Sequence, residues 1–208
     1  MYKCVKRAFD FVSALLLFIV ISPLFCIIAL LTRIYNGKPV FFRQERTGLN
    51  KKKFYMLKFR TMADTYDDEG NLLPDELRVT KWGKFLRSTS LDELPELINI
   101  IRGDMSVVGP RPLPTRYDEY YTEDEMKRFN VRGGLIPPCG SLEKNAIVTW
   151  DKQFEDEAWY ADNISLKLDI KIMFAVFRIL FQRNEGDYGS YVREPLDVER
   201  TKAANIRQ

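Results

Sequence analysis

The most pronounced pattern in the sequence is an unbroken apolar run near the amino terminus. Residues 11–31 read FVSALLLFIVISPLFCIIALL and carry no charge over 21 positions. A helix of about 20 apolar residues matches the thickness of the bilayer hydrocarbon core, so this run is a candidate membrane helix. A cleaved signal peptide is disfavoured, because the run is long and no small-residue cleavage site follows it. A helix buried inside a soluble protein is the remaining alternative.

Ser22 and Pro23 stand at the centre of this run. Proline cannot donate a backbone hydrogen bond and its ring clashes with the preceding turn, so we expect the helix to bend or break there. The Ser22 hydroxyl can bond to a carbonyl that is left over, which makes a break tolerable in lipid. Each arm then spans roughly 12–18 Å, which is too short to cross a hydrocarbon core of about 30 Å. The break therefore predicts a re-entrant helix-break-helix.

Basic residues flank the apolar run on both sides. They are Lys3, Lys6 and Arg7 before it, and Arg33, Lys38, Arg43 and Arg46 after it. An asymmetry of positive charge orients a spanning helix, whereas here both flanks are basic. A hairpin that returns to the cytoplasmic face satisfies both flanks at once. From the residues alone, a membrane hairpin over residues 1–36 and a Pro-kinked spanning helix both stay open.

Two short β-rich runs follow, at residues 40–43 and 54–59. They flank residues 48–50 (Gly-Leu-Asn), a sequence typical of a turn, and together they predict a β-hairpin. Alternation along the second run puts Lys58 and Arg60 on one face. In one interpretation these two cations face a phosphate. In the other they belong to a solvated basic strand near an anionic membrane.

Residues 87–112, RSTSLDELPELINIIRGDMSVVGPRP, combine two adjacent carboxylates with several arginines. Ser90-x-x-Glu93 matches a capping box, in which Ser90 caps a helix and Glu93 is its reciprocal partner. Asp92 then lies in the first turn, where the helix dipole favours negative charge. A well-made helix start accounts for both carboxylates without any function.

The same arrangement suits phosphate chemistry. A helix amino terminus lowers the pKa of Asp92 and keeps the carboxylate ionised, so that it can act as a nucleophile or as a ligand of Mg²⁺. Free N–H groups at that end receive phosphate oxygens. Arg87 precedes the pair, and Arg111 sits in a rigid Gly-Pro-Arg-Pro turn. Its guanidinium can bind phosphate through two parallel hydrogen bonds, with a surface ion pair as the alternative.

Residues 166–183 are strongly apolar with helical spacing. One narrow face of this helix collects Lys167, Lys171, Arg178 and Gln182. That face suits contact with anionic lipid. Asp169 falls almost opposite, on the apolar face, where a carboxylate needs either a buried ion pair with an arginine or a task in the active site. After Gly186 the periodicity is lost, and we expect a tail at residues 186–208 that is either mobile or a partner contact.

Composition narrows the chemistry. The net charge of +3 over 208 residues is too small for a protein that coats nucleic acid. Histidine is absent, which disfavours zinc sites and Ser-His triads and leaves catalysis mainly to Asp, Glu, Lys, Tyr or Cys. The three widely spaced cysteines make neither a disulfide framework nor a metal-ligand pattern, which indicates a reducing compartment.

Several motifs occur together in a fixed order. They are KRAFDF at residues 6–11, the run broken at Ser22-Pro23, FRQERTG at 42–48, KFRTM at 58–62, LRSTSLDELPEL at 86–97, GDMSVVGPRPL at 103–113 and SLKLDIKI at 165–172. Over residues 3–180 this combination resembles the small monotopic polyprenyl-phosphate phosphoglycosyl transferases, the bacterial sugar transferase family.

The resemblance implies a reaction and a site. Members of this family move a sugar 1-phosphate from a UDP-sugar to polyprenyl (undecaprenyl) phosphate, release UMP and use Mg²⁺. Asp92 matches the family's nucleophile, which forms a covalent phosphosugar intermediate, and Glu93 completes its Asp-Glu dyad. Asp92 is also the expected metal ligand. The family's membrane element is re-entrant, which favours the hairpin over a span.

The remaining site residues are expected to bind substrate, and they are Lys58, Arg60, Arg87, Arg111, Lys144 and Asp169. Many family members carry a PGITG-type turn and a GRN-type triplet, where this chain has GGLIPP at residues 133–138 and EKN at 143–145. Lys144 keeps the charge of the arginine often found there but loses the bidentate fork. We therefore expect an altered pocket for the donor or the leaving phosphate.

The sequence thus predicts an α/β protein, mostly helical with a small β-hairpin, whose residues 37–185 form a cytosolic catalytic domain. We expect it on the cytoplasmic face of the bacterial inner membrane. Its expected partners are polyprenyl phosphate, a UDP-sugar and inner-leaflet lipids, without nucleic acid, and a homo-oligomer is compatible with the sequence. Two rivals remain, namely a non-catalytic homologue that binds the lipid carrier or a partner, and a single-span protein with a soluble binding domain.

Overall fold

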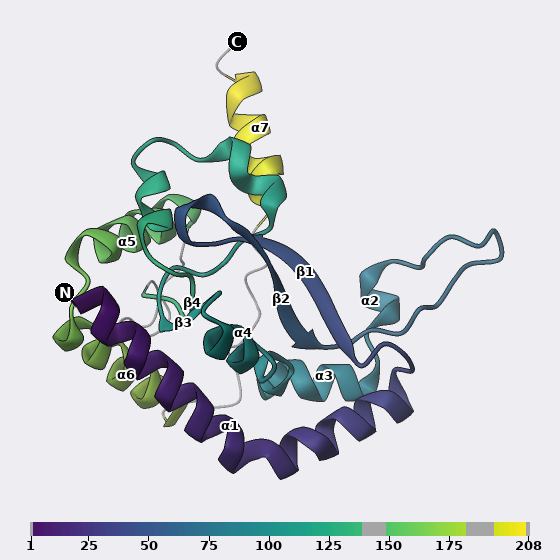
Figure 1. Cartoon of the computed structure of the whole chain (residues 1–208). Helices are drawn as coiled ribbons and strands as arrows, with labels where there is room; N and C mark the ends of the chain where they lie inside the picture. Colours follow the sequence, from purple (N-terminus) through teal and green to yellow (C-terminus); the bar gives the residue numbers. More distant parts are fainter. Residues whose placement is uncertain (1, 139–148, 182–193, 207–208) are drawn as a thin grey trace. The chain divides into compact units, whose positions relative to one another are not determined.

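The computed structural model describes residues 2–138, 149–181 and 194–206 (Figure 1). These residues are mostly helical with two small sheets, which confirms the predicted fold class in outline. The chain divides into two compact units. The first unit comprises Met1–Asp10, Glu45–Phe54 and Gly103–Gln208, and the second comprises Phe11–Gln44 and Tyr55–Arg102.

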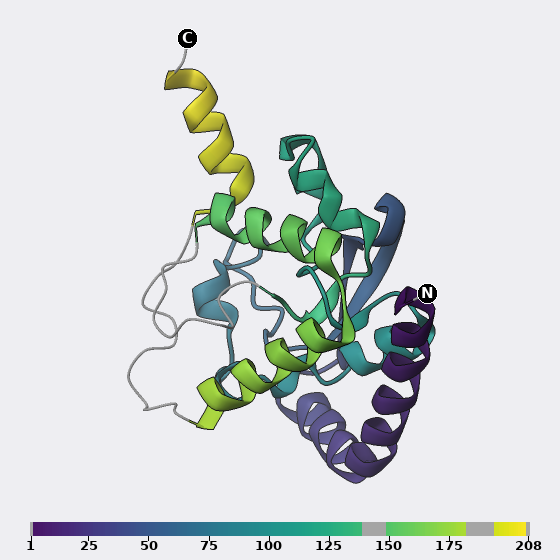
Figure 2. The same ribbon diagram turned by 90° about the vertical axis from the view of Figure 1, so that its left-hand side faces the viewer.

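The apolar run lies within one helix, α1 (Tyr2–Tyr35), which contains Pro23. The ribbon of α1 bends near its middle in both views (Figure 1, Figure 2). Pro23 leaves the Ile19 carbonyl without its backbone donor, and the Ser22 hydroxyl donates to that carbonyl at 2.8 Å. The helix is therefore bent rather than interrupted at Ser22-Pro23.

By length and composition α1 can cross a membrane, and only 11 % of its most apolar window is buried. The exposed side chains include Leu16, Val20 and Ile27. This extent of apolar exposure disfavours a helix buried in a soluble core and supports the predicted membrane association. The return of both helix ends to one membrane face stays a prediction.

The second unit forms its core against the carboxy-terminal half of α1. Phe25 and Ile28 of α1 pack against Phe59 of β2 (Lys53–Phe59) and Leu86 of α3 (Lys81–Ser88). Partly buried residues of α4 (Glu96–Arg102) and of the preceding turn complete the same apolar cluster. This packing fixes the elements that flank the predicted carboxylate pair.

The predicted β-hairpin is confirmed. β1 (Phe41–Thr47) and β2 form a two-stranded sheet, joined through a tight turn, η1 (Leu49–Lys51). The first strand continues to Thr47 rather than ending at residue 43. Asn50 in the turn has a φ angle of 53°, a left-handed conformation that asparagine accepts more readily than most residues. Lys58 lies within β2, whereas Arg60 lies just past its end.

Two parallel strands organise the first unit. β3 (Ser106–Val108) pairs with β4 (Gly134–Ile136), with Ser106 opposite Gly134 and Val108 opposite Ile136. A Cβ on Gly134 would lie 2.1 Å from the backbone nitrogen of Gly109, so this close approach requires glycine. Sequence reasoning missed the pair, because three-residue strands carry too little alternation to be recognised.

Two helices, α5 (Trp150–Asn163) and α6 (Leu166–Phe181), cover this pair and are joined by a short turn (Figure 2). Val108, Tyr160 and Ile172 bring the strands and both helices into one apolar cluster. The predicted helix at residues 166–183 is thereby confirmed over its described part. The other short elements are η3 (Thr115–Tyr120) and η4 (Glu125–Asn130) in the first unit and α2 (Asp75–Arg78) in the second.

The tail differs from the prediction. Residues 196–206 form a helix, α7 (Leu196–Ile206), and Leu196 is fully buried in a cluster with Trp150 and Phe154. Arg200 of α7 also pairs with Glu125 and Asp151. Contacts of this kind join distant segments, so they leave no periodic signal by which the sequence could reveal the helix.

Candidate active site

Asp92 and Glu93 lie on a single 3₁₀ turn, η2 (Leu91–Glu93), between α3 and α4. Ser90 before it adopts left-handed backbone angles (φ 57°, ψ 17°), and its side chain makes no capping hydrogen bond. Pro95 has no N–H for the hydrogen bond that would continue the turn as an α-helix, so α4 begins one residue later. The predicted capping box is therefore wrong.

A lysine connects Glu93 to the strand. Lys58 Nζ donates to Glu93 Oε1 at 2.6 Å and lies 3.3 Å from Glu96 Oε1. Glu96 is the first residue of α4 and is 3 % exposed. The ammonium group is thus held between two carboxylates, and it joins β2 to the dyad turn and to the start of α4.

The electrostatic environment of Asp92 also differs from the prediction. Burial raises the pKa of this partly buried carboxylate above its ordinary value, and Glu93 acts in the same direction. Lys58 and Arg87 oppose the shift by lowering the pKa. The sequence predicted a lowered pKa from a helix dipole. A single 3₁₀ turn supplies little dipole, so the cost of desolvation dominates.

The second unit contains two further cations that the sequence predicted for the site. Arg87 is exposed at the end of α3, and its Nε donates to the Thr61 hydroxyl at 3.0 Å. Arg60 is 8 % exposed, donates to the Lys38 carbonyl and forms an ion pair with Asp64. Arg87 therefore belongs to the dyad cluster through its effect on the aspartate, whereas Arg60 makes separate contacts.

The carboxylates around the Asp92–Glu93 pair can be compared with the ligands that Mg²⁺ uses in proteins. Lys58 pairs with the carboxylates of Glu93 and Glu96, and Lys58 and Arg87 both act electrostatically on the Asp92 carboxylate. Within the described ranges, no three Cys, Asp or Glu side chains form a preformed metal centre. Mg²⁺ is commonly bound by one or two carboxylates together with substrate phosphates, and this donor set fits that mode.

Arg111 belongs to the first unit, where a buried ion pair holds its backbone. The Arg111 N–H donates to Glu157 Oε1 at 3.0 Å, and its carbonyl accepts from Arg128 Nη2 at 2.6 Å. Glu157 and Arg128 pair with each other at 2.8 Å, with side chains 0 % and 2 % exposed. Burial raises the pKa of Glu157, and the Arg128 guanidinium opposes that shift. The backbone of Arg111 is thus held on both sides of its Cα atom.

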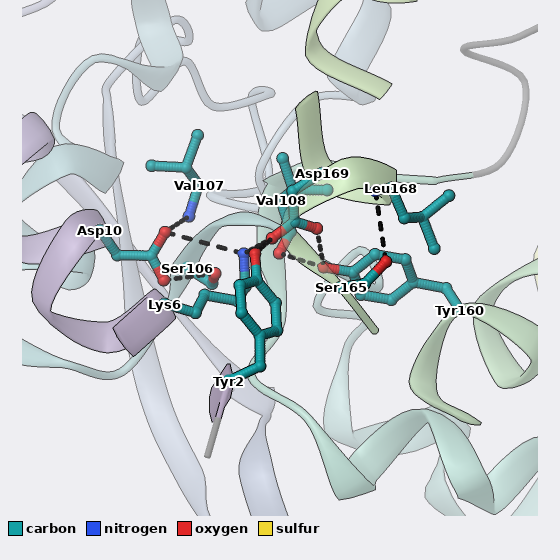
Figure 3. A network of polar contacts seen from close by, with 10 residues as sticks. All are labelled: Tyr2, Lys6, Asp10, Ser106, Val107, Val108, Tyr160, Ser165, Leu168 and Asp169. Carbon is teal, nitrogen blue, oxygen red and sulfur yellow. Dashed lines mark hydrogen bonds and ion pairs between the residues drawn. The ribbon is translucent and has the colours of Figure 1, made fainter. Parts of the chain in front are cut away.

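Asp169 of α6 lies at the centre of a polar network in the first unit (Figure 3). Its Oδ2 accepts from Lys6 Nζ at 2.7 Å and from the Tyr2 hydroxyl, while its Oδ1 accepts from the Tyr160 hydroxyl at 2.6 Å. The residue is 5 % exposed. The structure shows the buried ion pair that the sequence left as one of two alternatives, with a lysine in place of the arginine. A role for Asp169 in substrate binding stays a prediction.

The network continues to β3 through a second aspartate. Asp10 accepts from the Ser106 hydroxyl at 2.6 Å and from the Val107 N–H at 3.1 Å, and Lys6 Nζ lies 3.8 Å away (Figure 3). Burial and the hydrogen bond to Asp169 raise the pKa of Tyr160, so its hydroxyl keeps the proton that it donates. These contacts tie the first turns of α1 to β3 and α6.

Sequence reasoning missed several residues that contact the predicted site residues within each unit, namely Lys6, Glu96, Arg128 and Glu157. Glu157 did carry a signal, because it falls on the buried face of α5 that also includes Trp150 and Phe154. A carboxylate at such a position needs a cation. Glu96 carried none, since an acidic residue in a first helical turn is ordinary. Lys144 lies outside the described residues.

The fold and the site define a membrane-associated protein with an acidic cluster among cations, an arrangement suited to phosphate chemistry. Residues 1–183 match the family model described as bacterial sugar transferase, and the chain belongs to that family. The resemblance carried by the ordered motifs is thereby confirmed.

Curated relatives agree with this assignment. The chain is 45 % identical over 173 residues to the Uncharacterized sugar transferase EpsL of Bacillus subtilis, covering 83 % of this chain and 85 % of that protein. It is 38 % identical to the UDP-glucose:undecaprenyl-phosphate glucose-1-phosphate transferase of Escherichia coli, with 83 % of this chain and 39 % of the relative covered. It is 31 % identical to the UDP-N-acetylgalactosamine-undecaprenyl-phosphate N-acetylgalactosaminephosphotransferase of Aeromonas hydrophila, at 86 % and 44 % coverage. The chain thus spans less than half the length of the last two.

Proposed function

We propose that this protein transfers a sugar 1-phosphate from a UDP-sugar to undecaprenyl phosphate, releases UMP and so begins the assembly of a bacterial glycoconjugate. Membership of the bacterial sugar transferase family supports the reaction class, as do two relatives named for sugar-phosphate transfer with undecaprenyl phosphate. The observation that carries the proposal is the position of Asp92. Its carboxylate is partly exposed, and Lys58 and Arg87 both lower its pKa.

The reaction proceeds in two displacements at one phosphorus atom. A carboxylate oxygen of Asp92 attacks the β-phosphorus of the UDP-sugar, an O–P bond forms, and the bond to the α-phosphate oxygen breaks with release of UMP. An oxygen of undecaprenyl phosphate then attacks the same phosphorus, and the bond to Asp92 breaks. The products are the sugar linked to undecaprenyl diphosphate and a free carboxylate. Covalent catalysis of this kind divides one difficult transfer between anions into two steps.

The chain's own cations prepare Asp92 for the first step. Lys58 and Arg87 lower the pKa of Asp92 against the effect of burial, which keeps more of the carboxylate ionised. Glu93 and Glu96 hold the Lys58 ammonium in place. In this proposal Glu93 positions Lys58. Binding of the metal and transfer of a proton are the other two roles open to this glutamate.

Two groups meet the charge of the substrate. We propose that Arg111 of the first unit, whose backbone N–H and carbonyl are both held, binds phosphate through its guanidinium fork. Asp92 and the substrate phosphates would together hold Mg²⁺, whose charge offsets that of the diphosphate and of the leaving UMP. The fixed backbone of Arg111 supports this role, because it gives the side chain a defined starting point.

We also propose that α1 is re-entrant in the cytoplasmic membrane and keeps the site at the level of the acceptor's phosphate. The bend at Pro23 and the Ser22–Ile19 hydrogen bond support this arrangement. A variant with Cys26→Ala and Cys139→Ala retains Cys4 as the reporter. An impermeant maleimide added outside intact cells should leave Cys4 unlabelled until the cells are permeabilised. Labelling in intact cells would instead indicate a spanning helix.

The reaction is tested by UMP release from purified full-length protein, with undecaprenyl phosphate, Mg²⁺ and a panel of UDP-sugars. We expect release with at least one donor and its loss in Asp92→Asn. Undiminished release in Asp92→Asn would contradict the role of Asp92. Binding of UDP-sugar or lipid without UMP release from any donor would favour the non-catalytic alternative.

A further inference from the structure

A basic cavity of about 380 Å³ lies in the first unit, beside the first turns of α1. Its basic lining residues are Lys3, Lys6, Arg7 and Arg132. Asp10 is the acidic residue among the described residues that line it. The apolar side chains of Leu49 and Ile164 complete part of the wall. The cavity is therefore polar and cationic on one side and apolar on another.

Lys3 and Arg132 make hydrogen bonds to carbonyl groups, whereas Lys6 is paired with carboxylates. Lys6 is offset by Asp169 at 2.7 Å and by Asp10 at 3.8 Å, as Figure 3 illustrates. Lys3 Nζ, in contrast, donates to the Asn130 carbonyl at 3.1 Å, and Arg132 Nε donates to the Gly103 carbonyl at 2.8 Å. A carbonyl orients a cation without neutralising it. The cavity therefore retains positive charge around pre-oriented donors.

The cavity lies where α1 changes from polar to apolar. Lys3, Lys6 and Arg7 line it from one face of the helix, and Val5 and Phe9 on the opposite face are 57 % and 52 % exposed. The uncharged run begins immediately afterwards, at residue 11. In a membrane helix this transition lies at the level of the lipid headgroups. The cavity is thus positioned where headgroup phosphates are concentrated.

We propose that this cavity binds the phosphodiester headgroup of an anionic phospholipid and so holds the amino-terminal end of α1 at the membrane surface. Arg132 and Lys3 contact the phosphate oxygens, because a guanidinium fork and an ammonium are the usual partners of that group. Leu49 and Ile164 contact the glycerol and the first methylenes of the acyl chains. The described lining contains no aromatic side chain on which a nucleotide base would stack. This inference rests on membrane association and not on the transfer reaction.

The test uses Cys4, an exposed free cysteine that lines the cavity. Full-length protein in a neutral detergent is treated with a water-soluble maleimide, and modification is measured by peptide mass spectrometry. Short-chain phosphatidylglycerol should slow alkylation of Cys4 more than phosphatidylcholine does, and Cys26 in the same molecule serves as the internal control. Equal protection by the two lipids would overturn the proposal. Equal protection by inorganic phosphate would overturn the lipid assignment, since the site would then bind free phosphate.

Variants supply a second, independent measurement. Native mass spectrometry of the Lys3→Gln/Arg132→Gln double variant should show an affinity for phosphatidylglycerol about tenfold lower than that of the parent. Lys202→Gln, which removes one positive charge at an exposed position on α7, should bind as the parent does. Arg132→Lys, which keeps the charge but loses the fork, should bind phosphatidylglycerol better than Arg132→Gln and less well than the parent. Unchanged binding by the double variant, with its thermal stability preserved, would refute the proposal.

Discussion

Asp92 and Asp169 are two aspartates of this chain in contrasting settings. Asp169 is 5 % exposed, and its two oxygens accept hydrogen bonds from Tyr2, Lys6 and Tyr160. Asp92 is more exposed and has Glu93 beside it, and burial raises its pKa. Lys58, which lowers the pKa of Asp92, is already shared between two glutamates.

The Asp169 carboxylate therefore has a structural role, whereas the Asp92 carboxylate remains available for chemistry. Donors surround the charge of Asp169, so it ties α6 to the first turns of α1. The ionised form of Asp92 is only partly compensated, which costs stability. Such a cost is typical of functional sites, where perturbed titration accompanies reactivity. The predictions below change one side of this comparison at a time.

The largest effect is expected at Asp92. Asp92→Asn should reduce UMP release by at least about a thousandfold, because the amide cannot act as the nucleophile. The raised pKa means that the folded state binds a proton more tightly than the unfolded state does. The protein therefore loses stability as the pH rises from the ordinary pKa of aspartate through the raised pKa of Asp92. Asn removes that cost, so the melting temperature at neutral pH should rise by a few degrees.

Asp169→Asn should lower the stability of the protein, in contrast to Asp92→Asn. Loss of the charge leaves Lys6 without its closest buried partner, so the free energy of unfolding should fall by about 3 kcal/mol. Asp162→Asn, at an exposed position on α5, should change it by less than about 0.5 kcal/mol. Denaturant unfolding in detergent measures both variants. A raised KM with unchanged stability would instead assign Asp169 to substrate binding.

The pH dependence of kcat/KM tests the charges around Asp92. Activity should fall as the pH decreases through the pKa of Asp92, because only the ionised carboxylate attacks. Lys58 lowers that pKa, so Lys58→Gln should move the acidic limb to higher pH. Glu93 raises it, so Glu93→Gln should move the limb to lower pH. Shifts in the same direction for both variants would show that these groups do not control Asp92.

The smallest effect is expected at Ser90. Its hydroxyl makes no cap, so Ser90→Ala should change the free energy of unfolding by less than about 0.5 kcal/mol. Thr149 is the matched control, because its side chain accepts from the Lys152 N–H at 3.2 Å and caps α5. Thr149→Ala should cost about 1 kcal/mol. Equal losses in thermal or chemical unfolding would restore the capping box as an explanation of the dyad.

The elements with a strong local pattern could be predicted from the sequence. The apolar run specified α1, the bend at Pro23 followed from proline's missing N–H, and β-rich runs around a turn specified the hairpin. The β3–β4 pair and α7 could not be predicted. Both depend on contacts made by a few residues, such as the close approach of Gly134 to Gly109.

The site could be predicted only in part, for the same reason. Motif and charge identified Asp92 and Glu93, but the local structure was wrong because Pro95 limits the turn and Ser90 takes left-handed angles. The predicted direction of the Asp92 pKa shift was wrong for the same reason, because it assumed a helix dipole where the structure has a single 3₁₀ turn. Lys58 between two glutamates, and Arg128 with Glu157 behind Arg111, are contacts between distant segments. Such pairs are determined by tertiary packing, which a local pattern does not encode.

The central claim is that Asp92 carries the sugar phosphate during the reaction. Intact-protein mass spectrometry, after incubation with Mg²⁺ and a reactive UDP-sugar but without acceptor, tests it most directly. We predict an added mass of one sugar phosphate that peptide mapping assigns to Asp92, that disappears on adding undecaprenyl phosphate, and that is absent in Asp92→Asn. An adduct on another residue, or UMP release and product formation with no adduct under single-turnover conditions, would contradict the account.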